Sequence, residues 1–339
     1  MRRLYFSCPH CGQGDFGVDR VLGIDGYVTT GACRMACLAG VRQSFGRAEQ
    51  LLTELAGWEL DEETIRRLCH AEAAAATATR DERATAETFA AAAGDLELQI
   101  DAGKVNTLEG WRDVKVAVFA RRERGEPAVA ADWDKRDLPA PAVRTVVAAI
   151  EEAEHFGSRC AAEAARLDWT DFHALNVSGD GADWIWNLTN RHFPEAAQNL
   201  DIHHGSEHLA AAARRVFGTD SGDVKAQHER ALVLLLEDGY WGVTDWIGEI
   251  SGHIPVGGDG AALGETLNYF AGHQGRLQYA ARLRRGQSIG SGLVEGSIKQ
   301  LLNRRLKQTG ARWKTGHVGP LVEFHALANS PEWNDYWKN

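Results

Sequence analysis

The sequence has no apolar run long enough to cross a membrane and no apolar core of a secretory signal. A membrane-spanning helix needs about 18 or more predominantly apolar residues in succession, and none occurs in this chain. The first residues, MRRLYFSCPHCG, contain two arginines but no apolar segment behind them. We therefore expect a cytoplasmic protein that has no membrane partner.

The chain also lacks an excess of positive charge, and it has no internal repeats. Its formal net charge is −10 over 339 residues, which argues against a basic protein that coats DNA through charge alone. The charges are unevenly spread, however. Residues 276–314 are rich in Lys and Arg and contain a single acid, Glu295. Local charge matters more than the total when the partner is a polyanion, and the length allows two or three domains.

Cysteines are few, and four of the six form two close pairs. Cys8-x2-Cys11 and Cys33-x3-Cys37 are separated by a stretch rich in Gly and Val. In a chain without an export signal this pattern favours metal binding over disulfides. Two such pairs, projecting from short turns, can place four thiolates around one tetrahedral Zn²⁺. We therefore predict a zinc ribbon in residues 1–40, the alternative being four unpaired thiols.

Residues 41–94 are expected to be helical. Ser44 is a plausible N-cap for a helix that ends at Gly57, and Asp61 for a second helix that runs into residues 73–78. The short link between them suits either a DNA-binding helix-turn-helix or an ordinary helical hairpin, and the sequence leaves both open.

At residue 95 the apolar period changes from helical to alternating. Leu96, Leu98 and Ile100 alternate with polar residues up to Asp101, which predicts a half-buried strand. Gly103 and Asn106 suggest a turn, followed by a second alternating strand. Further along the chain we expect a helix over 139–166, a strand over 172–177, a turn at 178–181, a helix through Trp186 and a short strand over 198–202.

The remaining chain is expected to be largely helical. Residues 205–285 have helical character interrupted by a Gly-rich loop at 256–264, which does not match a phosphate-binding GxGxxG pattern. Residues 286–317 contain Glu295 and a basic segment. The tail, 318–339, is expected to form a helix with Trp333 and Trp337 packed on the core.

Three acids, Asp101, Asp180 and Glu295, fit a two-metal site. A lone carboxylate among cations repels the polyanion that the cations attract, unless it holds a metal ion such as Mg²⁺ (or Mn²⁺). An acid on a first strand, one after a later strand and one on a late helix suit an RNase H-like mixed sheet flanked by helices, a fold of the α/β class. Taken singly, Asp101 is an ordinary strand residue and Asp180 a turn former. Together the three predict metal-assisted phosphodiester chemistry.

The chain resembles the ISKra-type insertion-sequence transposases, DDE enzymes related to the Mutator-like and hAT-like families. The motifs that carry this resemblance are CPHCG at 8–12 with the second cysteine pair, GWRDVKV at 110–116, GDGADW at 179–184, Phe193-Pro194, Leu200-Asp201 with His204 and EHL at 207–209, IGSGLVE at 289–295, and RLKQTGARW at 305–313. One departure is Ala102, where the family usually has Gly after the first aspartate.

The resemblance implies that Asp101, Asp180 and Glu295 form the DDE triad that binds magnesium. Asp201-x2-His204 resembles an auxiliary motif that follows the second acid, and residues 205–285 would be a helical insertion before the glutamate. The implied activity is hydrolysis at the ends of an element, followed by attack of the 3′-hydroxyl on target DNA. Implied partners are double-stranded DNA, at the element ends and the target, and further copies in a homo-oligomer at the nucleoid. The N-terminal region looks short, as if an upstream DNA-binding part were missing.

Several assignments remain open at this stage. Asp201 could replace Asp180 as second ligand, and His204 with His208 could form either a metal-binding pair or a hydrogen-bonded helix start. Trp313 packs either on a DNA sugar or in the core. A domesticated, non-catalytic DNA-binding protein and an RNase H-like nuclease or resolvase are alternative functions. The residues expected to bind DNA phosphates are Arg304, Arg305, Lys307, Arg312 and Lys314.

Overall fold

The chain forms two compact units in the computed structural model, which describes residues 4–22, 24–25, 28–219, 221–252, 254 and 256–338. Unit 1 comprises residues 1–83, 105–112 and 300–339, and unit 2 comprises 84–104 and 113–299. The expected segment 286–317 is therefore divided, because Glu295 belongs to unit 2 and the basic residues from Arg304 onward belong to unit 1. Within the described ranges, no helix is both long enough and apolar enough to span a membrane.

Unit 2 is built on a five-stranded mixed sheet with the order β7-β6-β5-β8-β9. β6 pairs antiparallel with β7, whereas β8 is parallel to both β5 and β9. The strands are β5 (Asp95–Thr107), β6 (Gly110–Arg122), β7 (Val143–Ala149), β8 (Leu175–Gly179) and β9 (Ala197–Leu200). The α/β class and the mixed sheet flanked by helices are confirmed, and the arrangement is compatible with an RNase H-like fold.

Several expectations about this sheet are wrong, among them that the strand expected over 172–177 lies at 175–179. The first strand continues past Gly103 and Asn106 to Thr107, so the hairpin turns at residues 108–109. Residues 143–149 form β7 rather than helix, because β-branched side chains favour a strand when a neighbouring strand such as β6 is available for pairing. The helix expected over 139–166 begins only at α6 (Ala153–Arg166).

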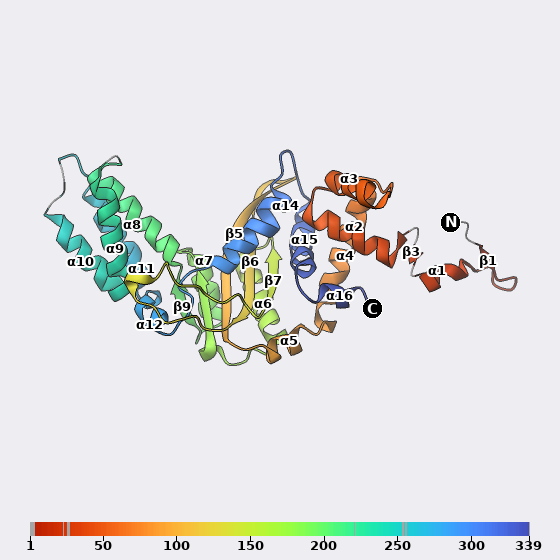
Figure 1. Ribbon diagram of the computed structural model, residues 1–339, viewed down its shortest axis with the longest axis horizontal. Coiled ribbons are helices and arrows are strands. Elements are labelled where there is room, and N and C mark those ends of the chain that lie inside the picture. Colours follow the sequence, from red (N-terminus) through yellow and green to blue (C-terminus); the bar gives the residue numbers. More distant parts are fainter. Residues whose placement is uncertain are drawn as a thin grey trace. The chain divides into compact units, whose positions relative to one another are not determined.

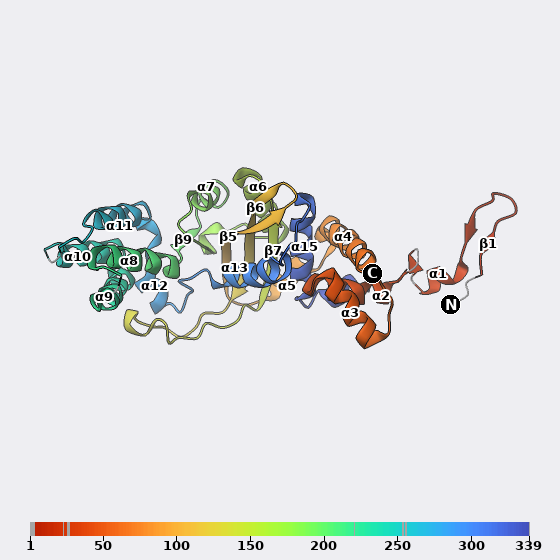
Figure 2. The ribbon, with the colours of Figure 1, turned by 90° about the horizontal axis from the view of Figure 1, so that it is seen from above.

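Both faces of β5 are covered by helices. Leu98 and Ile100 belong to an apolar core shared with α6 and α7 (Asp183–His192). The opposite face carries Glu97 and Gln99, which are 5% and 1% exposed, and α13 (Gly292–Ser297) packs on this face (Figure 2). The strand is therefore not half-buried as expected, because its polar side contacts a helix instead of solvent.

The helical insertion expected after β9 is present. It lies beyond the β9 edge of the sheet (Figure 1), and its buried residues, such as Leu209, Leu235 and Trp246, are continuous with the apolar core of the sheet. The Gly-rich segment before residue 261 connects two of its helices, as predicted. The helices are α8 (Ile202–Phe217), α9 (Asp223–Asp238), α10 (Tyr240–Ser251), α11 (Ala261–Gly272) and α12 (Tyr279–Arg284).

Unit 1 is mainly helical, and its helix ends confirm the predicted caps. The Ser44 side chain accepts from the Arg47 N–H and the Asp61 side chain from the Thr64 N–H, while Gly57 ends the first of the two helices with a φ of 64°. Helices α15 and α4 pack together, as do α2 and α4. The helices are α1 (Gly17–Leu22), α2 (Thr30–Arg42), α3 (Phe45–Ala56), α4 (Glu62–Ala78), α14 (Arg304–Leu306), α15 (Thr315–Ala328) and α16 (Trp333–Tyr336).

Short elements complete the two units. Two antiparallel pairs, β1 (Phe6–Ser7) with β2 (Gly14–Asp15) and β3 (Ile24–Asp25) with β4 (Val28–Thr29), precede α2. At the other end of the chain, Trp333 is buried against Phe324, which confirms the predicted packing of the aromatic tail. The remaining helical segments are η1 (Arg80–Glu82), α5 (Thr85–Ala91), η2 (Ala130–Asp132), η3 (Phe172–Ala174), η4 (Gln274–Arg276) and the π-helical η5 (Ile298–Asn303).

Candidate active site

Three aspartates from separate parts of the sequence lie together where β8 and β9 end, two of them directly after these strands and one, Asp101, at the neighbouring level within the longer β5. Ile100 of β5 pairs with Gly179 of β8 in parallel register, so Asp101 and Asp180 follow at the same level. Asp201 follows β9, whose last residue also pairs with Gly179. The carboxyl ends of parallel strands are where α/β proteins commonly assemble their sites. The strand register alone therefore brings these three acids together.

Glu295 is brought to the same place by a buried glutamine. The Gln99 side-chain oxygen accepts from the N–H groups of Leu293 and Val294 at 2.9 and 3.3 Å. These N–H groups belong to the first turn of α13, where no intrahelical partner exists. Since Gln99 and Asp101 are two residues apart on one strand, their side chains share a face. Gln99 thus holds the start of the glutamate-bearing helix on the face that carries Asp101.

Ser291 connects the glutamate to the third aspartate. Its N–H and its hydroxyl lie 2.5 and 2.9 Å from Asp201 Oδ2, and the hydroxyl also lies 3.0 Å from Glu295 Oε1. A side chain on Gly290 would place its Cβ 3.3 Å from the same Asp201 oxygen. The sequence Gly290-Ser291 therefore lets the backbone approach Asp201 closely, which explains these residues of the motif at 289–295.

The hydrogen bonds distinguish Asp180 from Asp201. Asp201 is 2% exposed. Its Oδ1 caps α8 by accepting from the His204 N–H at 2.8 Å, and its Oδ2 is occupied by Ser291. Asp180 uses only Oδ1, which accepts from Ala182 N–H at 2.9 Å, and its Oδ2 makes no hydrogen bond within the described part of the chain. The geometry thus favours Asp180 as the ligand and Asp201 as a positioning residue.

The cluster concentrates negative charge. Burial is the largest cause of a raised pKa at Asp101. Together with the nearby charges of Asp180, Glu295 and Asp201, and against a hydrogen bond from the Ala102 N–H that lowers it, burial brings the pKa of Asp101 to about 6. Because each acid is held in place by the fold, the carboxylates cannot separate far enough to relieve their repulsion. Such a concentration of charge attracts cations, but among the described residues these carboxylates, like the other His, Cys, Asp and Glu side chains, do not form a group of three or more arranged to hold a metal ion.

Asp101→Asn is expected to stabilise the cation-free protein at pH 8. The folded-state pKa of about 6 lies above the ordinary value of 3.8, so the ionised carboxylate destabilises the fold above pH 6, and this destabilisation disappears below about pH 4. After allowance for partial exposure, the gain in unfolding free energy is roughly 1–2 kcal/mol. Thermal unfolding of both proteins in a chelator, at pH 8 and pH 5, measures it. Equal differences between the proteins at the two pH values would contradict the raised pKa.

Tyr269 of α11 is a site neighbour that the sequence did not reveal. Its hydroxyl lies where a Cβ on Gly181 would come within 2.4 Å, so only glycine fits beside Asp180. Burial and the charges of Asp180 and Asp201 raise the pKa of Tyr269. Its ring stacks on His208 at a centroid distance of 3.7 Å. No local pattern marks it, because α11 is far from Asp180 in the sequence.

The histidines after Asp201 start a helix. The His204 N–H is capped by Asp201, which confirms the hydrogen-bonded helix start. The rings of His204 and His208 lie 5.0 Å apart at 73°. Burial, together with His204, lowers the pKa of His208. These contacts give the pair a packing role beside Tyr269.

The cysteine pairs are not gathered in the structure. In the ranges that the structure describes, no group of three or more His, Cys, Asp or Glu side chains is placed to hold a metal ion. Cys33 and Cys37 lie on α2, so the expectation that this pair projects from a turn is wrong. Cys37 contacts Cys33 and also Cys69, whereas Cys8 contacts Cys11. The zinc ribbon is not seen, and ligation by Cys8, Cys11, Cys33 and Cys37 stays a prediction.

The basic segment belongs to unit 1, and its cations fall into two groups. Arg305 is 2% exposed and donates to the Gly40 carbonyl at 2.8 Å, with its guanidinium 4.5 and 5.0 Å from the rings of Phe45 and Trp313. Trp313 is buried, and its ring N–H donates to the Leu306 carbonyl at 3.0 Å, so it packs in the core. Arg305 is therefore not available for the phosphate contact expected of it, because its guanidinium is enclosed by the core. The exposed cations are Arg304, Lys307, Arg312 and Lys314.

No protein-family model and no curated protein matches this chain. The site is therefore interpreted from its own residues.

Proposed function

We propose that this chain is a DNA transposase of a bacterial insertion sequence. The observation that supports it best is the meeting of Asp101, Asp180 and Glu295 where β8 and β9 end, from a strand, the end of a parallel strand and a late helix. This is the order of acids that a two-metal phosphodiester site on an RNase H-like sheet requires. The strand register and the hydrogen bonds of Gln99 and Ser291 support this proposal without any motif match.

The donor set fits Mg²⁺ (or Mn²⁺) by its chemistry. All the donors are carboxylate oxygens, which hard divalent cations prefer. The pKa of Asp101 is raised chiefly by burial and in smaller part by the neighbouring carboxylates, and a bound cation would offset both effects. Asp101 would bind both ions, with Asp180 and Glu295 binding one each. When bound, the ions supply charge neutralisation at the phosphate and a water of lowered pKa.

The residues around the acids hold them in place. Gln99 fixes the first turn of α13, and Ser291 holds Glu295 against Asp201. Asp201 caps α8 and also accepts from Ser291, which directly precedes the glutamate-bearing helix α13. The helical insertion and the start of α13 are therefore both anchored on one buried carboxylate. No side chain is needed as a covalent nucleophile, since a water and then a DNA 3′-hydroxyl serve as attacking groups.

DNA binding would fall to unit 1. Exposed Arg304, Lys307, Arg312 and Lys314 carry the charge that phosphate contacts need, and such contacts position DNA without reading sequence. Arg305 would not contact DNA itself. It would hold this segment in place through its contacts with Gly40, Phe45 and Trp313. Sequence reading would come from α3, α4 and a zinc ribbon of Cys8, Cys11, Cys33 and Cys37. The protein would act on double-stranded DNA at the nucleoid, as a homo-oligomer that joins two element ends.

A nuclease or resolvase is the second candidate, because it would use the same cluster of acids. It would cut without joining. A non-catalytic DNA-binding relative would leave the acids without use, and the arrangement of Gln99 and Ser291 around them weighs against it.

A strand-transfer assay separates the three functions. Inverted repeats are first sought in the DNA on both sides of the reading frame. The full chain is then incubated with Mg²⁺, a labelled duplex carrying such a repeat, and a supercoiled target plasmid. We expect 3′-hydroxyl ends at the repeat boundary and a labelled product joined to the plasmid. Cleavage without joining would favour the nuclease. A mobility shift with no metal-dependent cleavage would contradict both enzymatic functions.

A further inference from the structure

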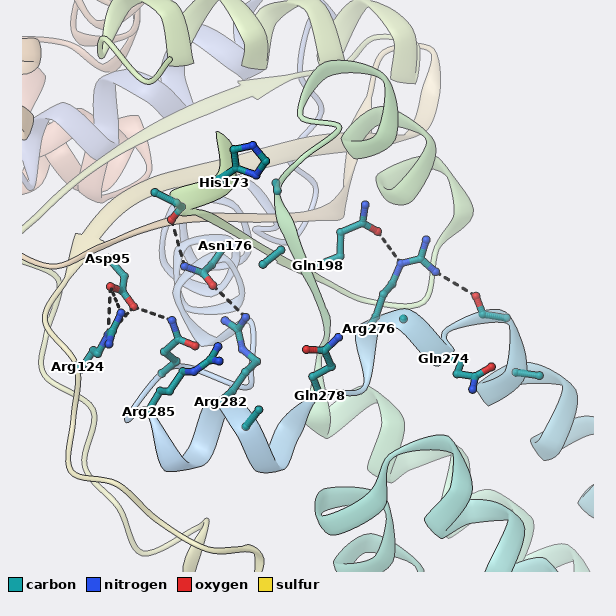
Figure 3. Close-up of a pocket in the computed structure, with 18 residues that line it drawn as sticks. Asp95, Arg124, His173, Asn176, Gln198, Gln274, Arg276, Gln278, Arg282 and Arg285 are labelled. Atoms are coloured by element: carbon teal, nitrogen blue, oxygen red, sulfur yellow. Dashed lines mark hydrogen bonds and ion pairs between the residues drawn. The ribbon is translucent and has the colours of Figure 1, made fainter. Parts of the chain in front are cut away.

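A second polar site lies at the N-terminal ends of β5, β8 and β9, whereas the acids lie toward the C-terminal ends of β8 and β9. Asp95 begins β5, Asn176 lies near the start of β8 and Ala197 begins β9, and all three line a cavity of about 770 Å³ (Figure 3). The acids follow the other ends of β8 and β9. The cavity is therefore separated from the acidic cluster by the length of the strands, and the proposed cleavage chemistry does not use it.

The cavity carries an excess of positive charge. Four arginines line it, and among its described lining residues Asp95 is the one acid. That acid is already occupied, because Arg124 binds it at 3.0 Å and the Gln287 amide donates to it at 2.8 Å. The arginines that this carboxylate does not pair with are Arg276, Arg282 and Arg285.

Arg282 fixes one positive charge in the wall of the cavity. It is 6% exposed and donates to two neutral acceptors, the Ser288 carbonyl at 2.8 Å and Asn176 Oδ1 at 3.0 Å. Burial lowers the pKa of Arg282 to about 10, so it remains charged at neutral pH. The nearby carboxylates of Glu97 and Asp95 offset part of this charge, but neither bonds Arg282 directly, and a buried guanidinium without a directly bonded carboxylate is costly to keep. An anionic ligand would compensate this charge.

Two further arginines offer hydrogen bonds to such a ligand. Arg285 is exposed, and its side chain makes no hydrogen bond or ion pair with any described residue. Arg276 stacks on the Trp186 ring at 4.5 Å, donates through Nε to Gln198 Oε1 at 2.8 Å and through Nη1 to the Gly272 carbonyl at 3.1 Å, and its Nη1 also lies 3.1 Å from His273 Nδ1, which leaves Nη2 for a ligand. This stacking fixes the guanidinium plane. In Figure 3 Arg276 and Arg282 lie on either side of Gln278. The unengaged guanidinium of Arg285 can bind phosphate oxygens in a bidentate way, and Nη2 of the fixed Arg276 can add one further hydrogen bond.

We propose that this cavity binds phosphate groups, at a site separate from the acidic cluster and independent of the proposed transposase activity. The phosphates belong either to a nucleic-acid strand or to a free nucleotide or pyrophosphate. The lining supplies arginines and the glutamine amides of Gln274 and Gln278 for phosphate and sugar oxygens, whereas the Gln198 amide is already bonded to Asn190 and Arg276. In both cases Arg285 and Arg276 contact the ligand directly, and Arg282 contributes its charge.

Binding measurements on the full-length chain test the proposal. The probes are a fluorescent 12-nucleotide single strand, followed by anisotropy, and pyrophosphate and ATP, followed by calorimetry, all with Asp101→Asn as the parent so that no strand is cleaved. Arg285→Ala and Arg276→Ala are compared with Arg144→Ala, which removes an exposed arginine of β7 outside the cavity. Each of the first two is expected to weaken binding about tenfold, and Arg144→Ala less than about twofold.

The two sources give different patterns. If the ligand is a strand, the loss appears with the oligonucleotide, and the slope of log affinity against log salt falls by about one. If it is a free nucleotide or pyrophosphate, the loss appears with ATP or pyrophosphate. Arg285→Lys, which keeps the charge but not the fork, should recover part of either loss. Arg285→Ala and Arg276→Ala that bind every probe as Arg144→Ala does, with unchanged thermal unfolding, would overturn the proposal. Failure of strand transfer would leave it intact.

Discussion

Asp101→Asn, Asp180→Asn and Glu295→Gln are each expected to reduce Mg²⁺-dependent cleavage of element ends by about 1,000-fold or more. The amides keep the size of the acids but remove the charge that a divalent cation needs. Loss of one preorganised electrostatic group already costs about 100- to 1,000-fold in other enzymes, and here it would also weaken metal binding. Single-turnover cleavage of a labelled duplex end measures the effect.

The matched control for these substitutions is Asp183→Asn. Asp183 is exposed in the first turn of α7, close to Asp180 in the chain, and its loss removes one charge near the site. It should change cleavage by less than about threefold. Binding of uncut DNA should survive all four substitutions, because the exposed cations lie in unit 1. Cleavage within tenfold of the parent in any one triad variant would exclude that residue from the site.

Elements stabilised by local interactions could be predicted from the sequence. The helices that begin after Ser44 and Asp61 were predicted from their caps, since an N-cap side chain satisfies N–H groups within the same turn. Alternation likewise identified β5 and β6. By contrast, the Ala-rich segment that contains residues 143–149 predicts a helix, whereas the structure has a strand there. These residues form a strand because they pair with β6. That partner is not visible in a short window of sequence.

The boundaries of the compact units depend on long-range contacts in the same way. The hairpin tip of β5 and β6 joins residues from the end of the chain, because the Leu108 N–H donates to the Trp313 carbonyl at 2.9 Å and the Trp313 N–H to the Asn106 carbonyl at 3.1 Å. Nothing in the composition of either segment predicts this pairing. A division of the chain into consecutive segments therefore could not reproduce the two units.

The proximity of the acids could be predicted from the sequence, but most of the residues that hold them in place could not. Asp101, Asp180 and Glu295 were identified from charge, strand pattern and resemblance, and the structure places all three in unit 2. Gln99 looked like one more polar residue of an exposed face. It becomes a helix anchor only once α13 covers that face. Tyr269 lies on a helix remote in sequence, so its contact with Gly181 required the folded chain.

Asp201→Asn and Asp180→Asn are expected to differ in their effects on stability and on cleavage. This difference separates a residue that positions the site from one that binds the metal. The asparagine oxygen can still cap His204, but its NH₂ group cannot accept the two hydrogen bonds that Ser291 now donates to Oδ2. A buried N–H without an acceptor costs about 1–3 kcal/mol, and bonds to a charged acceptor are worth more than neutral ones. The unfolding free energy should therefore fall by roughly 2–4 kcal/mol, and the unfolding temperature by about 5–10 °C.

Asp180→Asn should leave the unfolding temperature nearly unchanged, because the asparagine oxygen still accepts from the Ala182 N–H. Cleavage should show the opposite order. It should be almost abolished in Asp180→Asn and reduced about 10- to 100-fold in Asp201→Asn, as for the loss of an outer residue that orients a metal ligand. Ser291→Ala, which removes the hydroxyl but keeps the N–H, should fall between the parent and Asp201→Asn in both measurements. If Asp201→Asn abolished cleavage at an unchanged unfolding temperature, Asp201 would be the ligand, and the reasoning from its two occupied oxygens would be wrong.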